Sequence, residues 1–159
     1  MNYFELFDIP VSLTVDKSML ANKYFELQKK YHPDFFTQSD NDEQADALEK
    51  SSEINKALKV LQKKDSTIQY VLKLKGLLTD DEKYQLPPDF LMEMMDLNEN
   101  ATGDAVSAVT VLENEIYLPV KSIIENYQDM VTSETDLLKV KEYYYKKKYL
   151  QRILDRRNG

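Results

Sequence analysis

The sequence predicts an all-α protein, and the prediction rests on its turn residues and its apolar periodicity. Only three glycines and five prolines occur among 159 residues, and few stretches alternate β-branched with polar residues. Apolar residues instead recur at intervals of three and four, the spacing of one face of an α-helix. The composition, 42% hydrophobic and 31% charged, is that of a globular chain, and this length can bury one core or two small ones.

The first part of the chain predicts a helical hairpin preceded by a short aromatic element. Residues 3–7 are too few to form a helix that is stable alone, so we expect them to pack on another element. Asp16 is a plausible N-cap for a helix that ends near Tyr31. A polar loop follows, and Asp40 or Asn41 can cap the next helix. The predicted apolar stripe of that helix is Ala47, Leu48, Ser51, Ile54, Leu58 and Leu61.

A fourth helix and a linker are predicted next. Asp65 or Ser66 can cap this helix, and Gly76 is a credible residue at which it ends. The stretch after Gly76 holds a Thr-Asp-Asp-Glu run and ends in a pair of prolines, which is typical of a linker. The predicted inward residues of the fourth helix are Ile68, Val71, Leu72 and Leu74. We therefore predict an N-terminal domain, a linker and a C-terminal domain over residues 1–76, 77–87 and 88–159.

The C-terminal domain is predicted to be an antiparallel bundle of three helices. Pro88 or Asp89 opens the first helix, which runs to about Glu99. The second helix has an apolar stripe that continues on both sides of Pro119, so we expect a kink there rather than a break. The stripe comprises Val106, Val109, Leu112, Ile116, Val120, Ile123 and Tyr127.

The third helix of this bundle is predicted to be strongly basic. It is capped by Thr132 or Ser133 and reaches about Arg157. Residues 77–136 hold 2 basic and 14 acidic side chains, whereas residues 137–159 hold 8 basic and 2 acidic ones. The basic helix either neutralises an acidic helix pair or contributes to a charged docking face. Its predicted core residues are Leu137, Val140, Tyr144, Leu150 and Ile153.

Composition excludes several classes of function. The chain has no cysteine and one histidine, so it cannot supply a thiolate nucleophile, a cysteine-ligated cluster or the usual zinc ligands. We expect no cofactor and no metal site. No window has the roughly 18 uninterrupted apolar residues of a membrane span, and no signal sequence is recognisable. A net charge of −7 argues against nucleic-acid binding. These observations predict a soluble, cytoplasmic protein.

The stretch Tyr31-His32-Pro33-Asp34 concentrates unusual features. Pro33 removes a backbone donor and favours extended geometry at His32, so the preceding helix should end there. Residues two apart across a proline are expected to point in different directions, and no nucleophile, metal site or predicted pocket accompanies His32 and Asp34. We therefore predict that the protein is not an enzyme. The tripeptide is either a simple helix stop or a contact surface.

Several motifs together resemble a known family. Tyr-His-Pro-Asp at the end of a basic helix, followed by a polar loop and a Ser-x-x-Ile-Asn-x-Ala-x-x-x-Leu helix over 51–61, is similar to a J-domain. The motifs at 2–7, 70–76 and 90–93 resemble those of HscB-type co-chaperones of iron–sulfur cluster assembly. The resemblance covers nearly the whole chain and implies an L-shaped protein with a J-domain and a C-terminal bundle.

The resemblance also implies partners and site residues. J-domains stimulate ATP hydrolysis by chaperones of the DnaK or HscA type, and the C-terminal bundle of this family binds an IscU-type scaffold protein. The implied chaperone-binding residues are His32, Pro33, Asp34, Lys23, Lys29 and Lys30. The implied scaffold-binding residues are Leu91, Met92, Met95, Asp96, Glu99 and Tyr149.

Alternatives remain open at this point. Leu91, Met92 and Met95 could belong to the bundle core, although Phe90, Met94 and Leu97 offer a competing inward face. The protein could also be a J-domain co-chaperone for a different client, or a helical adaptor without chaperone activity.

The sequence departs from the family pattern in places. Phe35 replaces the usual lysine after the aspartate, which weakens one basic contact, and a further acidic position of the family falls on Gly103. The run of tyrosines and lysines at 143–148 is expected to form a solvated or internally paired face.

Overall fold

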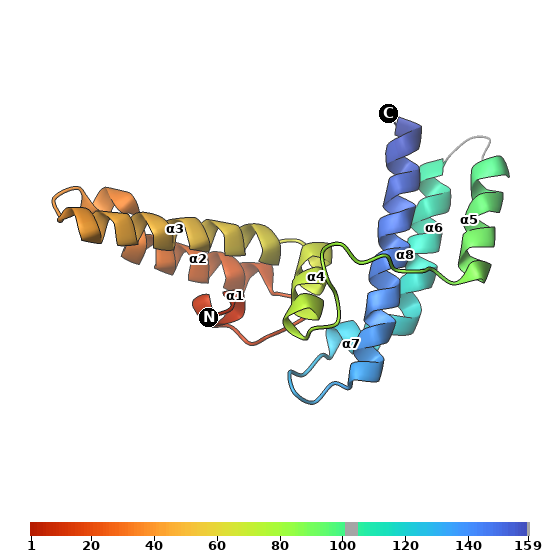
Figure 1. Cartoon of the computed structure of the whole chain (residues 1–159), viewed down its shortest axis with the longest axis horizontal. Helices are drawn as coiled ribbons and strands as arrows, with labels where there is room; N and C mark the ends of the chain where they lie inside the picture. The colour runs from red at the N-terminus through yellow and green to blue at the C-terminus, as the bar shows by residue number, and fades with distance from the viewer. Residues whose placement is uncertain (101–104, 159) are drawn as a thin grey trace. The chain divides into compact units, whose positions relative to one another are not determined.

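The computed structural model describes residues 1–100 and 105–158, apart from the side chains at 98–100, 105, 157 and 158. Every regular element in these ranges is helical (Figure 1), which confirms the all-α prediction. The chain divides into two compact units, Met1–Val71 and Leu72–Gly159. The predicted boundary near Gly76 stays a prediction. In the described part of the chain, no helix is both long and apolar enough to cross a membrane.

The N-terminal unit is built around a pair of antiparallel helices, α2 and α3 (Figure 1). The Asp16 carboxylate accepts a hydrogen bond from the Met19 N–H at 2.8 Å, and Asp40 accepts one from the Glu43 N–H at 2.8 Å. Both predicted N-caps are therefore confirmed. The elements are α1 (Tyr3–Leu6), α2 (Lys17–Tyr31), the 3₁₀ helix η1 (Pro33–Phe36), α3 (Asn41–Leu61) and α4 (Lys64–Leu74), which crosses into the second unit.

The core of this unit collects one face from each helix. The short helix α1 is attached by Tyr3, whose ring stacks on Tyr70 at 4.7 Å and whose N–H donates to the Tyr70 hydroxyl at 2.9 Å. Leu48, predicted to be buried, is 62% exposed. The inward face of α3 is centred on Ile54 and Ala57, and Leu48 lies on the other side of the helix. Leu74 on α4 is also exposed. The main buried side chains are Phe4, Phe7, Leu13, Leu20, Ala47, Ile54, Ala57, Leu61, Ile68 and Val71.

Helix α4 begins one to two residues earlier than its predicted caps. The buried Thr67 hydroxyl donates to the Lys63 carbonyl at 2.7 Å, and the Ser66 hydroxyl donates to the same carbonyl at 3.2 Å, so both residues lie inside the first turn. The predicted end is confirmed. Gly76 has φ +72°, a conformation that favours glycine, and its N–H donates to the Lys73 carbonyl at 3.0 Å.

The C-terminal unit is a bundle of three long helices, α5, α6 and α8 (Figure 1). Helix α5 is held by Phe90 and Met94, which are buried against Val109 of α6 and against Leu150 and Ile153 of α8. The Ser133 hydroxyl accepts a hydrogen bond from the Asp136 N–H and caps α8 as predicted. The elements are α5 (Pro88–Asn100), α6 (Ala105–Tyr117), the 3₁₀ helix η2 (Leu118–Val120), α7 (Lys121–Glu125) and α8 (Glu134–Asn158).

Pro119 breaks its helix rather than kinking it. The chain leaves the α-helix at Tyr117, passes through η2 and resumes as α7, because proline has no N–H to continue the hydrogen-bond ladder. A 3₁₀ turn has fewer residues than an α-turn and shifts the phase of the stripe. Ile124 is therefore buried in place of the predicted Ile123, and Val106 at the other end is exposed.

The segment between α4 and α5, which we call the strap (residues 77–87), packs within the C-terminal unit. Leu78 is buried, and Glu82 forms an ion pair with Lys141 of α8. The Tyr84 ring stacks on Tyr145 of α8 with a centroid distance of 4.5 Å and an interplanar angle of 6°. A segment with the composition of a loop is thus fixed to α8 at two successive points.

Glu82 is expected to make the stability of the C-terminal unit depend on pH. The hydrogen bond from Lys141 holds the pKa of the Glu82 carboxyl below its ordinary value. Because the unfolded chain binds this proton more readily, the stabilisation is present above the ordinary glutamate pKa and is lost as the pH falls through the lowered pKa. Glu82→Gln should lower the free energy of unfolding at pH 7, by up to about 1 kcal/mol, and the loss should vanish in acid.

Urea unfolding of both proteins between pH 7 and about pH 3 measures this difference. Asp81→Asn is the matched control, since Asp81 is an exposed neighbour with no ion pair among the described residues. A difference between Glu82→Gln and wild type that stays constant over the whole pH range would contradict the expectation.

Candidate functional site

The turn that follows α2 is held by its own hydrogen bonds. His32 has φ −63° and ψ 133°, the extended geometry predicted for a residue before proline, and α2 ends at Tyr31. The His32 Nδ1 atom accepts a hydrogen bond from the Asp34 N–H at 3.2 Å and so caps η1. An accepting Nδ1 carries no proton, so the proton of the neutral ring is on Nε2, which is left as a donor.

The side chains of His32 and Asp34 lie closer together than predicted. The Asp34 Oδ2 atom is 3.6 Å from His32 Nδ1, because the tight turn of η1 folds the chain back at Pro33. The expectation that the two side chains diverge is therefore wrong. Asp34 and half of the His32 ring are exposed to solvent. The turn therefore presents a hydrogen-bond donor and a carboxylate side by side. Among the described residues, no three His, Asp or Glu side chains converge as potential metal ligands.

The predicted lysines of α2 differ in their surroundings. Lys29 and Lys30 are exposed in the last helical turn, next to His32, where a positive charge is favoured by the helix dipole. The Lys30 Nζ atom lies 5.3 Å from the centroid of the Tyr31 ring, over which Lys50 of α3 also lies. Lys29 and Lys30 are thus grouped with the turn as a positive surface.

Lys23 differs from Lys29 and Lys30 because it already lies near two carboxylates. Its Nζ atom lies 3.8 Å from Asp8 and 4.0 Å from Glu26, and its side chain is largely covered. Two nearby carboxylates already compensate its charge, so a partner would gain less from Lys23 than from Lys29 or Lys30.

Two aromatic residues near the turn are exposed; sequence reasoning missed Phe25 and noted Phe35 only as the replacement of a lysine. Phe25, one helical turn before Lys29, is 63% exposed, and Phe35, directly after Asp34, is 65% exposed. The Phe35 ring stands edge-on to His32 at 6.2 Å. The buried or half-buried residues Leu20, Tyr24 and Leu27 share one face of α2 at helical spacing, and Phe25 falls outside that face; this spacing is the signal that the sequence offers. Exposed aromatic side chains beside cationic ones are typical of protein-binding surfaces.

The apolar residues of α5 separate into an inward and an outward face. Phe90 and Met94 are buried and Leu97 packs against them, which confirms the predicted inward face. Met92 and Met95 are 65% and 58% exposed. Leu91 is half-buried and Asp96 is exposed, whereas the side chain of Glu99 and the whole of Gly103 lie outside the described residues.

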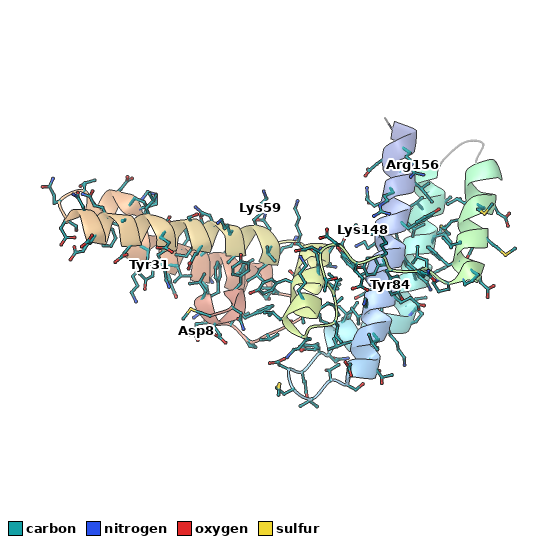
Figure 2. The ribbon with its side chains drawn as sticks, viewed as in Figure 1. Asp8, Tyr31, Lys59, Tyr84, Lys148 and Arg156 are labelled. Carbon is teal, nitrogen blue, oxygen red and sulfur yellow. The ribbon has the colours of Figure 1, made fainter. Side chains whose placement is uncertain are left out.

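Tyr149 of α8 lies next to the first turn of α5. Its half-buried ring meets Phe90 edge-on at 6.0 Å, and the Lys146 Nζ atom lies over the same Phe90 ring at 5.4 Å. Figure 2 shows methionine sulfur atoms on the side of α5 that faces away from α6 and α8. We call Leu91, Met92, Met95 and Asp96 the α5 surface; helix α5 has four acidic residues and no basic one.

The hairpin with its exposed His-Pro-Asp turn defines a J-domain protein, and comparisons with known proteins agree. Residues 2–70 match a family model described as DnaJ domain, and residues 86–156 match one described as HSCB C-terminal oligomerisation domain. The chain is 34% identical over 122 residues to a co-chaperone protein HscB homolog of Vibrio vulnificus, covering 73% of this chain and 71% of that protein.

Solved structures show the same relationship. The crystal structure of human co-chaperone protein HscB matches with a TM-score of 0.79 and 30% identity, covering 98% of this chain and 80% of that one. Chaperone HscB from Vibrio cholerae matches with a TM-score of 0.63 and 27% identity, over 98% and 99% of the two chains. The chain belongs to the HscB family of J-domain co-chaperones. It is a co-chaperone of iron–sulfur cluster assembly with a chaperone as its partner, and it is not an enzyme.

Proposed function

We propose that the protein binds an IscU-type scaffold protein through its C-terminal unit and delivers it to a DnaK- or HscA-type chaperone, whose ATP hydrolysis it stimulates. The observation that carries this proposal is the His32-Pro33-Asp34 turn, which is exposed and yet fixed by the hydrogen bond to His32 Nδ1. A turn that is already ordered binds its partner at a smaller cost in conformational entropy than a flexible one would.

In the chaperone contact, the turn supplies directional groups and the helix supplies charge. His32 offers its Nε2–H as a donor and Asp34 offers a carboxylate as an acceptor. Lys29 and Lys30 add a compact positive surface that attracts an acidic partner over distances of about 10 Å at moderate ionic strength. Pro33 maintains the geometry, and Lys23 contributes at the edge after release from its carboxylates.

In the scaffold contact, the α5 surface supplies apolar area. Met92 and Met95 expose flexible, polarisable side chains that adapt to the shape of a partner. Their exposure would be unfavourable on a helix that only served the bundle core, because Phe90 and Met94 already fill the core on the opposite face. Asp96, Glu99 and Tyr149 complete the proposed scaffold-binding residues.

The two contacts lie on one polypeptide, and this linkage explains how delivery works. Once the scaffold is bound, it is held near the chaperone at an effective concentration in the millimolar range. The scaffold therefore meets the chaperone at the moment when the turn promotes hydrolysis. Neither contact requires chemistry by this chain.

Single-turnover ATP hydrolysis by a DnaK-class chaperone tests the proposal. We expect the full chain alone to stimulate hydrolysis. Addition of an IscU-type scaffold should lower the chain concentration that gives half-maximal stimulation by at least about tenfold, as expected for bivalent binding. If the chain stimulates but the scaffold changes nothing, the client is a different protein. An absence of stimulation at any concentration would leave only the helical adaptor.

A further inference from the structure

A small pocket lies beside Tyr149 where the strap crosses α8, and Tyr149 is the one proposed docking residue among those that line it. Figure 2 labels Tyr84 and Lys148 in this region. The pocket has a volume of about 200 Å³. Strap and α8 line it chiefly with Lys83, Tyr84, Tyr145, Lys148, Tyr149 and Arg152.

The walls of this pocket are fixed without any ligand. The parallel Tyr84 and Tyr145 rings form one wall, and the Lys141 Nζ atom lies 5.5 Å from the centroid of the Tyr84 ring. Burial raises the pKa of both phenols, so both hydroxyls keep their protons and remain hydrogen-bond donors. Glu82, the acidic residue among those that line the pocket, is already paired with Lys141.

The remaining charges in the pocket are positive and uncompensated. Lys83 and Arg152 have no ion-pair partner among the residues that the structure describes, and Lys148 reaches only the Tyr144 ring, at 5.9 Å. All three side chains are exposed, so solvent screens their mutual repulsion in the free protein, and a docked anion would be attracted by all three charges. A guanidinium beside ammonium and phenol donors suits a carboxylate, which arginine binds through two parallel hydrogen bonds. The pocket is therefore chemically complementary to a carboxylate.

We propose that this pocket binds a carboxylate side chain from an acidic segment of the scaffold protein that docks on the α5 surface. This inference rests on the proposed scaffold binding. Continuity supports it, because Tyr149 lines the pocket and also contacts Phe90 of α5. The charges support it too, because every charged residue of α5 is acidic, whereas most charged residues that line the pocket are basic. The docked protein must then present basic groups to α5 and an acidic group to the pocket, which fixes its orientation.

Titration calorimetry with an IscU-type scaffold and the full-length chain tests the pocket. Arg152→Glu should weaken scaffold binding at least about tenfold at low salt. Lys83→Ala with Arg152→Ala should weaken binding and also flatten its dependence on salt concentration, because two attractive charges are removed. The matched control is Arg156→Ala, one turn farther along α8, exposed and outside the pocket, which should bind as wild type does.

The outcomes separate this inference from the proposed function. If Arg152→Glu binds as wild type does while Met92→Ala with Met95→Ala binds weakly, the pocket plays no part and the α5 surface stands. If both variants bind as wild type does, scaffold binding by this unit fails as a whole.

Rescue and a free anion supply two further tests. Exchange of one exposed acidic residue of the scaffold for lysine should restore binding to Arg152→Glu, and failure at every such position would overturn the pairing. Inorganic phosphate serves as a competing small anion. If phosphate occupies the pocket, as followed by the NMR signals of its residues, without weakening scaffold binding, the pocket is a small-anion site and the inference is wrong.

Discussion

His32→Gln is expected to abolish stimulation of the chaperone while the protein stays folded. Glutamine cannot both accept the Asp34 N–H and present a donor at the position of Nε2, because its amide sits on a longer, freely rotating chain. The His32 ring is half-exposed and outside the core, so the free energy of unfolding should change by no more than about 0.5 kcal/mol. Single-turnover ATP hydrolysis at saturating co-chaperone should fall to the rate of the chaperone alone.

Two comparisons make this result specific. Gln38→Ala changes an exposed residue just beyond η1 and should stimulate as wild type does. Scaffold affinity of His32→Gln should also be unchanged, because the α5 surface belongs to the other unit. If His32→Gln stimulates as well as wild type does, the turn does not take part in chaperone stimulation and only ends helix α2.

Met92→Ala combined with Met95→Ala is expected to weaken scaffold binding by about two orders of magnitude. Each exposed methionine that becomes buried on docking contributes about 1 to 1.5 kcal/mol, which corresponds to roughly tenfold per residue. Both side chains are more than half exposed in the free protein, so their loss should leave the thermal midpoint nearly unchanged. Calorimetric titration with the scaffold measures the effect.

The chain offers matched methionine controls for this experiment. Met130, in the loop before α8, is 89% exposed, and Met130→Ala should change neither stability nor affinity. Met94 is fully buried on the same helix as the test residues, and Met94→Ala should instead destabilise the unit by about 2 to 5 kcal/mol. Unchanged affinity in the double variant would show that the scaffold binds elsewhere.

Local signals in the sequence predicted much of this fold. The carboxylates of Asp16 and Asp40 act within one helical turn, so the caps could be read directly from the chain. The same holds for Gly76, whose left-handed conformation is a local property. Periodicity was less exact at helix ends and around Pro119, where a change of helix type shifts the phase.

Contacts between distant segments could not be predicted in this way. In the run at 143–148, the predicted core residue Tyr144 is only half-buried, and its neighbour Tyr143 is buried instead. Tyr143 packs on Tyr117 at 5.7 Å, whereas Tyr145, two residues on, stacks on Tyr84. Such pairs depend on how elements far apart in sequence meet, and composition carries no information about that. The roles of the docking residues came from family resemblance, since exposure alone does not identify a partner.

The attachment of the strap also bears on how this region can change in evolution. A flexible linker tolerates insertions and deletions because no position in it has a fixed neighbour. Here Glu82 and Tyr84 each contact a defined residue of α8 and Leu78 is buried, so an added or deleted residue between them would move at least one of the three from its place. We therefore expect the spacing of these three positions to vary less among functional homologues than the composition of the intervening residues.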